Sequence, residues 1–142
     1  MGWWGTGVFD GDDPREYLNH VIYRFEQEIE KVLAGNLPEL ATLLEFHAGP
    51  HALDCCLVPT LAIIVALHET LESEYLPALN TVRRWKEQCL RRFDESDDWD
   101  HPETKAERRA VIVRTFDSLS QFCLQRESWL KETGHSEAPL DR

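Results

Sequence analysis

Apolar residues recur along most of this chain with the three-and-four spacing of an α-helix, and polar residues fill the positions between them. After a glycine-rich opening, the first such stripe predicts a helix that buries one face. Asp13 is its predicted N-cap, with Pro14 in the first helical position and Glu16 completing a capping box. Gly35 and Asn36 are expected to end it, because both residue types readily close a helix.

The middle of the chain is more apolar than the segments around it. A short helix is expected at 38–46, where a Gly-Pro pair then stops it. The next segment, 52–75, is apolar on all sides between 57 and 67, which is typical of a central, buried helix. Pro59 is expected either to start this helix or to kink it.

Two more amphipathic patterns complete the chain. Pro77 is expected to open the first, whose apolar face contains Trp85 and whose opposite face is basic. The second is expected at 103–131, and residues 133–142 are expected to fray. The predicted apolar line of this last helix consists of Val111, Ile112, Phe116, Leu119, Phe122, Cys123 and Trp129.

Four long helices with short connections predict an all-α fold, namely an antiparallel bundle with one additional short helix. Residues 1–12 are expected to form an N-terminal arm packed on this bundle. The 142 residues fit a single domain.

The charge of the chain narrows the range of partners. Twenty-six acidic residues against fifteen basic ones give a formal net charge of −11. A surface this negative repels nucleic acid and anionic membranes, and it attracts basic proteins by electrostatic steering. The longest apolar stretch, 57–67, is too short to span a bilayer. We therefore expect a protein partner rather than nucleic acid or a membrane.

The four cysteines are predicted to be reduced thiols. Three of them lie within apolar helical patterns, and the chain does not open with a basic region followed by an apolar run. Cysteines that stay reduced favour a cytoplasmic protein. The cysteines are Cys55, Cys56, Cys89 and Cys123.

The opening stretch, WGTGVFDGDD, could cradle a phosphate, hold a metal or pack on the body of the protein. A dinucleotide fingerprint would need a glycine where Asp10 stands, and the Gly-Lys-Ser/Thr end of a P-loop is absent. Calcium loops starting at Asp10 or Asp94 would place Pro14 or Trp99 at positions that require other residues. Zinc, di-iron and nucleophile-elbow spacings are also missing from the sequence. We predict no metal, no cofactor and no catalytic residue.

Packing is the remaining interpretation of this stretch. Gly5 and Gly7 permit bent backbone, so the tryptophan and the phenylalanine of the stretch can both turn onto the helices. Asp12 and Asp13 are expected to accept hydrogen bonds from the first amides of the following helix. The predicted structural signature is Trp4, Gly5, Gly7, Phe9, Asp12 and Asp13.

This Trp-Gly-x-Gly-x-Phe-x-x-Asp signature resembles the start of the bacterial family called domain of unknown function 4259. The apolar run LAIIVALHETLES and the tryptophan one helix later are also similar to that family's layout. The chain departs from the family in Trp3, in Pro14 and in its long last helix. The resemblance implies an α-helical cytosolic bacterial protein and supplies no catalytic residue.

The run DESDDWD joins the last two predicted helices. It is either a solvated loop or an anionic patch with an aromatic anchor, which would suit docking on a basic protein surface. The candidate partner-binding residues are Asp94, Glu95, Asp97, Asp98, Trp99 and Asp100.

Together these patterns favour a non-enzymatic, acidic helical protein that binds another protein, in the style of an immunity protein that neutralises a basic partner. Two alternatives stay open. One is a small regulatory domain that acts by self-association as a homo-oligomer. The other is an enzyme whose carboxylates, such as Glu69, Glu72 and Asp98, meet only in the fold.

Overall fold

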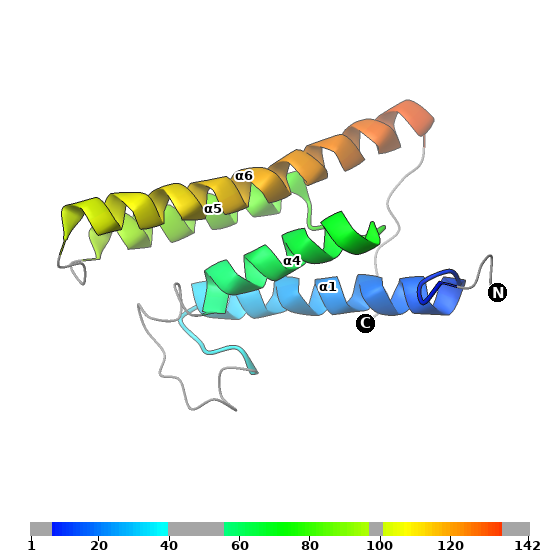
Figure 1. Ribbon diagram of the computed structural model, residues 1–142, viewed down its shortest axis with the longest axis horizontal. Coiled ribbons are helices and arrows are strands. Elements are labelled where there is room, and N and C mark those ends of the chain that lie inside the picture. Colours follow the sequence, from blue (N-terminus) through cyan, green and yellow to red (C-terminus); the bar gives the residue numbers. More distant parts are fainter. Residues whose placement is uncertain (1–6, 40–55, 97–100, 135–142) are drawn as a thin grey trace.

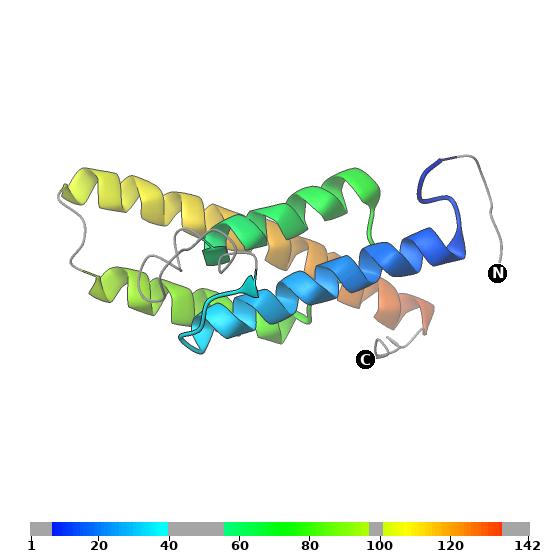
Figure 2. The same cartoon turned by 90° about the horizontal axis from the view of Figure 1, so that it is seen from below.

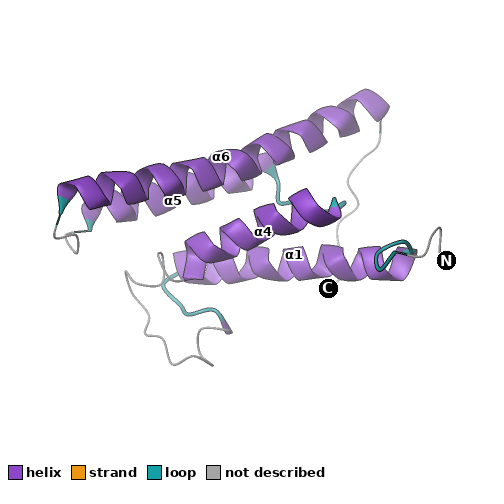
Figure 3. Ribbon diagram, viewed as in Figure 1, coloured by secondary structure: helices purple, strands orange, loops and turns teal. Residues whose placement is uncertain are grey.

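The computed structural model describes residues 7–39, 56–96 and 101–134, which form helices and their connections (Figure 1). These ranges contain no β-strand, as Figure 3 shows, so the predicted all-α class is confirmed for them. The helices are α1 (Asp12–Leu33), α4 (Val58–Leu71), α5 (Leu79–Glu95) and α6 (Pro102–Thr133).

The four helices pack in pairs. In two views at right angles, α1 and α4 lie side by side and run in opposite directions (Figures 1 and 2). α5 and α6 also run in opposite directions and contact each other, while α6 packs on α4 and α1 reaches α5. All four helices contribute to one apolar core, where Trp85 of α5 and Phe116 of α6 are completely buried.

Helix α1 begins earlier than the sequence predicts. Its N-cap is Gly11, whose carbonyl accepts a hydrogen bond from the Arg15 amide at 3.2 Å. The prediction of Asp13 as the N-cap is therefore wrong, because Asp12 and Asp13 already lie in the first helical turn. Carboxylates in that turn still favour the helix through its macrodipole.

The predicted end of α1 is confirmed. Gly35 has a φ of 88°, and its amide donates to the carbonyl of Val32 at 3.0 Å. The amide of Asn36 donates to the carbonyl of Lys31 at 2.9 Å. This pair of hydrogen bonds is the Schellman arrangement, which a left-handed glycine makes possible. The short helix predicted at 38–46 lies outside the described residues, apart from its first two positions.

Helix α4 is not buried on all sides. Pro59 stands in its first turn, so the interpretation of this proline as a helix start is confirmed. Val58, Leu61 and Ile64 are buried against α1 and α6, whereas Ile63 is 45% exposed. The prediction of a central helix is therefore wrong, since the neighbouring helices cover only one of its faces.

Helices α5 and α6 follow their predicted patterns with two corrections. Pro77 was expected to open the first of them, but α5 begins at Leu79 with Ala78 as its N-cap. The apolar face of α5 is buried and its basic face is exposed or half-buried. In α6, Val111 and Trp129 were expected in the apolar line but are 36% and 54% exposed. These two residues are a whole number of helical turns apart, so they lie on the same side of α6, beside the buried stripe.

The described part of the N-terminal arm is a tight turn. The Asp10 amide donates to the Gly7 carbonyl at 3.1 Å, and the Gly7 amide donates to Oδ2 of Asp10 at 2.8 Å. A Cβ at Gly7 would lie 2.7 Å from that same oxygen, so glycine suits the position. Phe9 packs against the core, while Trp4 and Gly5 lie outside the described residues.

Three of the four cysteines are free and buried, as predicted: Cys56, Cys89 and Cys123. The thiol of Cys123 donates to the carbonyl of Pro77 at 3.1 Å. Cys55 lies outside the described residues. In the part of the chain that the structure describes, no helix combines the length and the apolar character needed to cross a membrane.

Candidate functional site

The connection between α4 and α5 is held by side chains from α1. Nη1 of Arg15 donates to the carbonyl of Leu71 at 2.5 Å and to that of Glu72 at 3.0 Å. One turn further along α1, Oδ1 of Asn19 accepts a hydrogen bond from the Tyr75 amide at 3.0 Å. The start of α1 is thereby fixed beside the end of α4, where a cation is favoured by the partial negative charge of the last carbonyls.

This contact brings together two groups of carboxylates that are far apart in the sequence. One group belongs to the first two turns of α1, and the other belongs to the last turn of α4 and the residues after it. All six side chains are exposed. The start of α1 and the end of α4 both lie at the right-hand end of these helices in Figure 1. We call this surface the acidic end; its members are Asp12, Asp13, Glu16, Glu69, Glu72 and Glu74.

Two guanidinium groups lie within the acidic end, and both donate to main-chain carbonyls. Arg15 binds the carbonyls of Leu71 and Glu72, and Nε of Arg126 in α6 donates to the carbonyl of Glu74 at 2.7 Å. Among the described residues of this surface the carboxylates outnumber the guanidiniums, so their net charge is negative. Among the described residues, no three His, Cys, Asp or Glu side chains are arranged to hold a metal ion.

His68 lies at the inner edge of the acidic end. Its Nδ1 is 3.0 Å from Oγ of Ser73, and its ring packs on Phe122 with 4.6 Å between ring centroids. Burial lowers the pKa of His68, although Ser73 and Glu72 act in the opposite direction. A serine paired with a histidine can serve as a nucleophile. Ser73, however, is only 4% exposed, so the pair acts to hold the turn after α4.

The acidic run predicted to bind a partner is partly engaged within the protein. Nε and Nη2 of Arg109 donate to the two carboxylate oxygens of Asp94 at 2.8 and 3.0 Å, and this hydrogen bonding lowers the pKa of Asp94. Nζ of Lys105 donates to the carbonyls of Asp94 and Ser96 at 3.2 and 2.8 Å. Glu95 is exposed. The other candidates, Asp97, Asp98, Trp99 and Asp100, lie outside the described residues.

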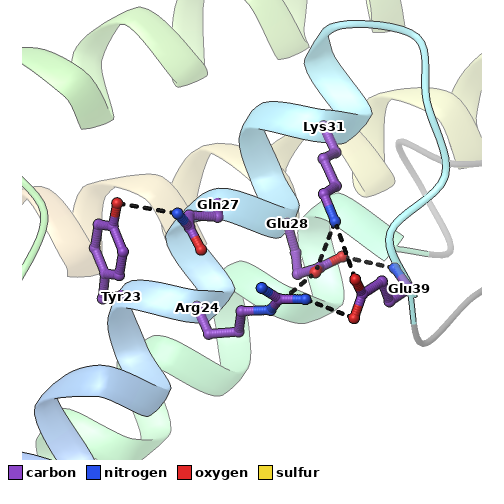
Figure 4. A network of polar contacts seen from close by, with 6 residues as sticks. All are labelled: Tyr23, Arg24, Gln27, Glu28, Lys31 and Glu39. Carbon is purple, nitrogen blue, oxygen red and sulfur yellow. Dashed lines mark hydrogen bonds and ion pairs between the residues drawn. The ribbon is translucent and has the colours of Figure 1, made fainter. Parts of the chain in front are cut away.

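A second polar cluster lies near the end of α1 (Figure 4). The carboxylate of Glu28 is 5% exposed and accepts a hydrogen bond from the Glu39 amide at 2.9 Å. Arg24 and Lys31 each lie 3.5 Å from Glu28 and also pair with the Glu39 carboxylate. These contacts bind residue 39 to α1, which is a structural role.

An open hollow of about 530 Å³ adjoins this cluster and is lined by Tyr23, Gln27, Glu30 and neighbouring residues of α1. Several of its polar groups are engaged in hydrogen bonds within the protein. Gln27 donates to the hydroxyl of Tyr23 at 3.0 Å, and Glu30 accepts from Arg84 and from Nε1 of Trp85, the latter at 2.7 Å. The hollow is therefore a weaker candidate for binding than the acidic end.

Sequence reasoning missed the acidic end as one surface. It predicted that Asp12 and Asp13 accept hydrogen bonds from the first amides of the helix, and it named Glu69 and Glu72 only as carboxylates of a possible enzyme, without joining the two groups. Arg15 is the residue in the sequence that could have indicated this surface. A cation in the first turn of a helix opposes the macrodipole of that helix, so its presence indicates a partner elsewhere in the fold.

Comparison of the chain with protein-family models, with curated proteins and with solved structures finds no match. The resemblance of its opening residues to the family called domain of unknown function 4259 therefore stays a prediction.

Proposed function

We propose that this protein binds a basic protein partner through the acidic end and is not an enzyme. The observation that carries the proposal is the meeting of two acidic segments at one exposed surface, joined by the hydrogen bonds of Arg15 to Leu71 and Glu72. The net charge of −11 also favours a basic partner, because it steers a cationic protein towards this one from a distance. The neutralisation of a basic toxin by an acidic immunity protein is one example of such an interaction.

The proposal predicts a strong dependence of binding on salt. Exposed charges interact over about 8 Å at physiological ionic strength, and added salt shortens that range. Charges at the rim of an interface mainly accelerate association. A partner held by the acidic end should therefore associate more slowly and bind more weakly as salt increases.

The test is capture of partners from a lysate of the source organism at low and high salt. The variant Glu69→Gln/Glu72→Gln/Glu74→Gln removes half of the acidic end without changing side-chain size. We expect wild-type protein to retain a basic partner at low salt and to release it at high salt. The variant should fail to retain that partner at either salt concentration.

A matched control separates the acidic end from overall charge. It neutralises three exposed carboxylates on α5 and α6 and should bind as wild type does. If control and variant lose the partner equally, net charge rather than the acidic end governs binding, and the proposal is wrong. The control positions are Glu87, Glu107 and Glu132.

The acidic run between α5 and α6 is proposed as a secondary contact, with Trp99 as its anchor. The pairing of Asp94 with Arg109 reduces the charge that this run can offer. We therefore expect Trp99→Ala to weaken capture of the same partner less than the triple variant does. A larger loss with Trp99→Ala would make the run the main contact.

We also propose that the whole chain is one cytoplasmic domain in which the four helices form an antiparallel bundle. Support comes from two antiparallel pairs, α1 with α4 and α5 with α6, which pack on each other through α4 on α6 and α5 on α1 and so close a ring of helices. The N-terminal arm covers part of this ring. The contact of Phe9 with the core and the buried thiols of Cys56, Cys89 and Cys123 agree with the proposal.

A further inference from the structure

An aromatic ring lies exposed at the start of α1, within the acidic end. Among the large apolar residues that the structure describes, Val8 and Tyr17 are the most exposed, at 79% and 70%. Val8 precedes α1, and Tyr17 lies in the second turn of that helix. The next residue along the chain, Leu18, is buried in the core. Tyr17 therefore belongs to the outward side of α1 and contributes its ring to the surface.

Carboxylates flank this ring. Asp13 lies one helical turn before Tyr17, so the two side chains share a face of α1, and Glu16 adjoins Tyr17 in the chain. Both carboxylates are exposed. The Glu16 carboxylate lies 3.8 Å from Nε2 of His20, one turn further along the same helix. A cation that approaches Tyr17 from solvent thus meets negative charge beside an aromatic face.

This combination of groups favours one kind of cation. A positive charge over the face of an aromatic ring is attracted by the ring, and nearby carboxylates attract the same charge. The guanidinium of arginine is planar, so it can stack on a ring while its N–H groups donate to carboxylates at its edge. The ammonium group of lysine is a more strongly hydrated point charge and cannot stack in this way.

We propose that Tyr17 is the aromatic contact of the acidic end and binds an arginine side chain of the basic partner. The guanidinium stacks on the Tyr17 ring, and its N–H groups donate to the carboxylates of Asp13 and Glu16. This inference rests on the proposed function and specifies which basic residue the partner presents. Tyrosine and arginine are both enriched among the residues that contribute most to protein interfaces.

The test is isothermal titration calorimetry of the full chain at low salt with two synthetic peptides of equal length and charge. One peptide contains only arginine and glycine, and the other contains only lysine and glycine. We expect the arginine peptide to bind more tightly to the wild-type chain. Tyr17→Leu removes the ring but keeps an apolar side chain, and it should weaken binding of the arginine peptide by about three- to ten-fold.

Tyr17→Phe is the matched control. It keeps the ring and removes only the hydroxyl, so it should bind the arginine peptide as wild type does. Because Tyr17 is mostly exposed, neither substitution should disturb the core. Far-UV circular dichroism verifies that both variants are folded.

Three results would overturn the inference. They are equal affinity of the wild-type chain for the two peptides, no binding of either peptide, and unchanged binding of the arginine peptide by Tyr17→Leu. The proposed function is judged by a different measurement, namely the salt-dependent capture of a partner that Glu69→Gln/Glu72→Gln/Glu74→Gln loses. A protein that retains its partner in that experiment but shows no preference for arginine would keep the proposed function and lose this inference.

Discussion

Arg15 is the single residue on which the arrangement of the candidate site depends most. Its guanidinium joins the first turn of α1 to the last carbonyls of α4, 56 residues away in the sequence. Its charge is unfavourable within its own helix and favourable at the end of the other one. The position of this positive charge is therefore explained only by the contacts of the folded chain.

Arg15→Ala should destabilise the protein, because it removes two charge-assisted hydrogen bonds to carbonyls. We expect a loss of about 1–2 kcal/mol in the free energy of unfolding, since the side chain is partly exposed. Urea denaturation measures this loss. Arg83→Ala, at an exposed position on α5, is the control and should change stability by less than about 0.5 kcal/mol.

His68 makes the stability of the same region depend on pH. Burial lowers the pKa of this histidine below its ordinary value of 6.5 in the folded chain. The unfolded chain therefore binds the proton more readily, and protonation favours unfolding. The contribution of His68 to stability should be fully present above about pH 6.5 and should decrease as the pH falls below that value.

Urea denaturation at several pH values between neutral and mildly acid compares wild type with His68→Gln. The wild-type chain should lose more stability over this range than the variant does, because glutamine does not titrate. Parallel pH profiles for the two proteins would contradict the assignment.

At the scale of elements, the predicted signature concerns the N-terminal arm. Phe9 packs on the core, and the turn from Gly7 to Asp10 bends the chain as the signature requires. Whether the tryptophan of the signature also packs there is still a prediction, because it lies outside the described residues.

Trp4→Ala tests the arm. If this tryptophan packs on the helices, its removal should lower the free energy of unfolding by about 3–5 kcal/mol, as truncation of large buried aromatic residues does. Trp129→Ala removes an exposed tryptophan from α6 and should cost clearly less. Thermal unfolding of both variants measures the difference, and an unchanged midpoint for Trp4→Ala would show that the arm does not stabilise the fold.

At the scale of the whole molecule, the excess of acid is a cost to stability. Like charges gathered at one surface repel one another and lower the free energy of unfolding. Proteins commonly lose some stability in this way at surfaces that serve binding. Neutralising part of the acidic end should relieve this repulsion.

The variant Glu69→Gln/Glu72→Gln/Glu74→Gln should therefore be at least as stable as wild type while binding its partner less well. Thermal unfolding at low salt is the measurement, because salt screens the repulsion. A large loss of stability would instead assign these glutamates a structural role, and the loss of binding could then be explained by unfolding.

The sequence by itself determined where the described helices lie and part of their buried faces. The end of α1 at Gly35 and the apolar face of α5 around Trp85 were predicted correctly. Pro59 stands in the first turn of α4, which is one of the two alternatives that the sequence left open. Helical period, proline and glycine act over a few neighbouring residues, so their effects can be predicted from a short stretch of chain.

Only the tertiary structure decided which charged groups and which helix faces remain exposed on the surface. Asp94 is paired with Arg109, Ile63 of an apolar helix is left exposed, and Arg15 joins two acidic segments into one surface. Each of these facts depends on where a partner distant in the sequence lies. Contacts of that kind follow from how the helices pack, and the local pattern of the chain does not contain them.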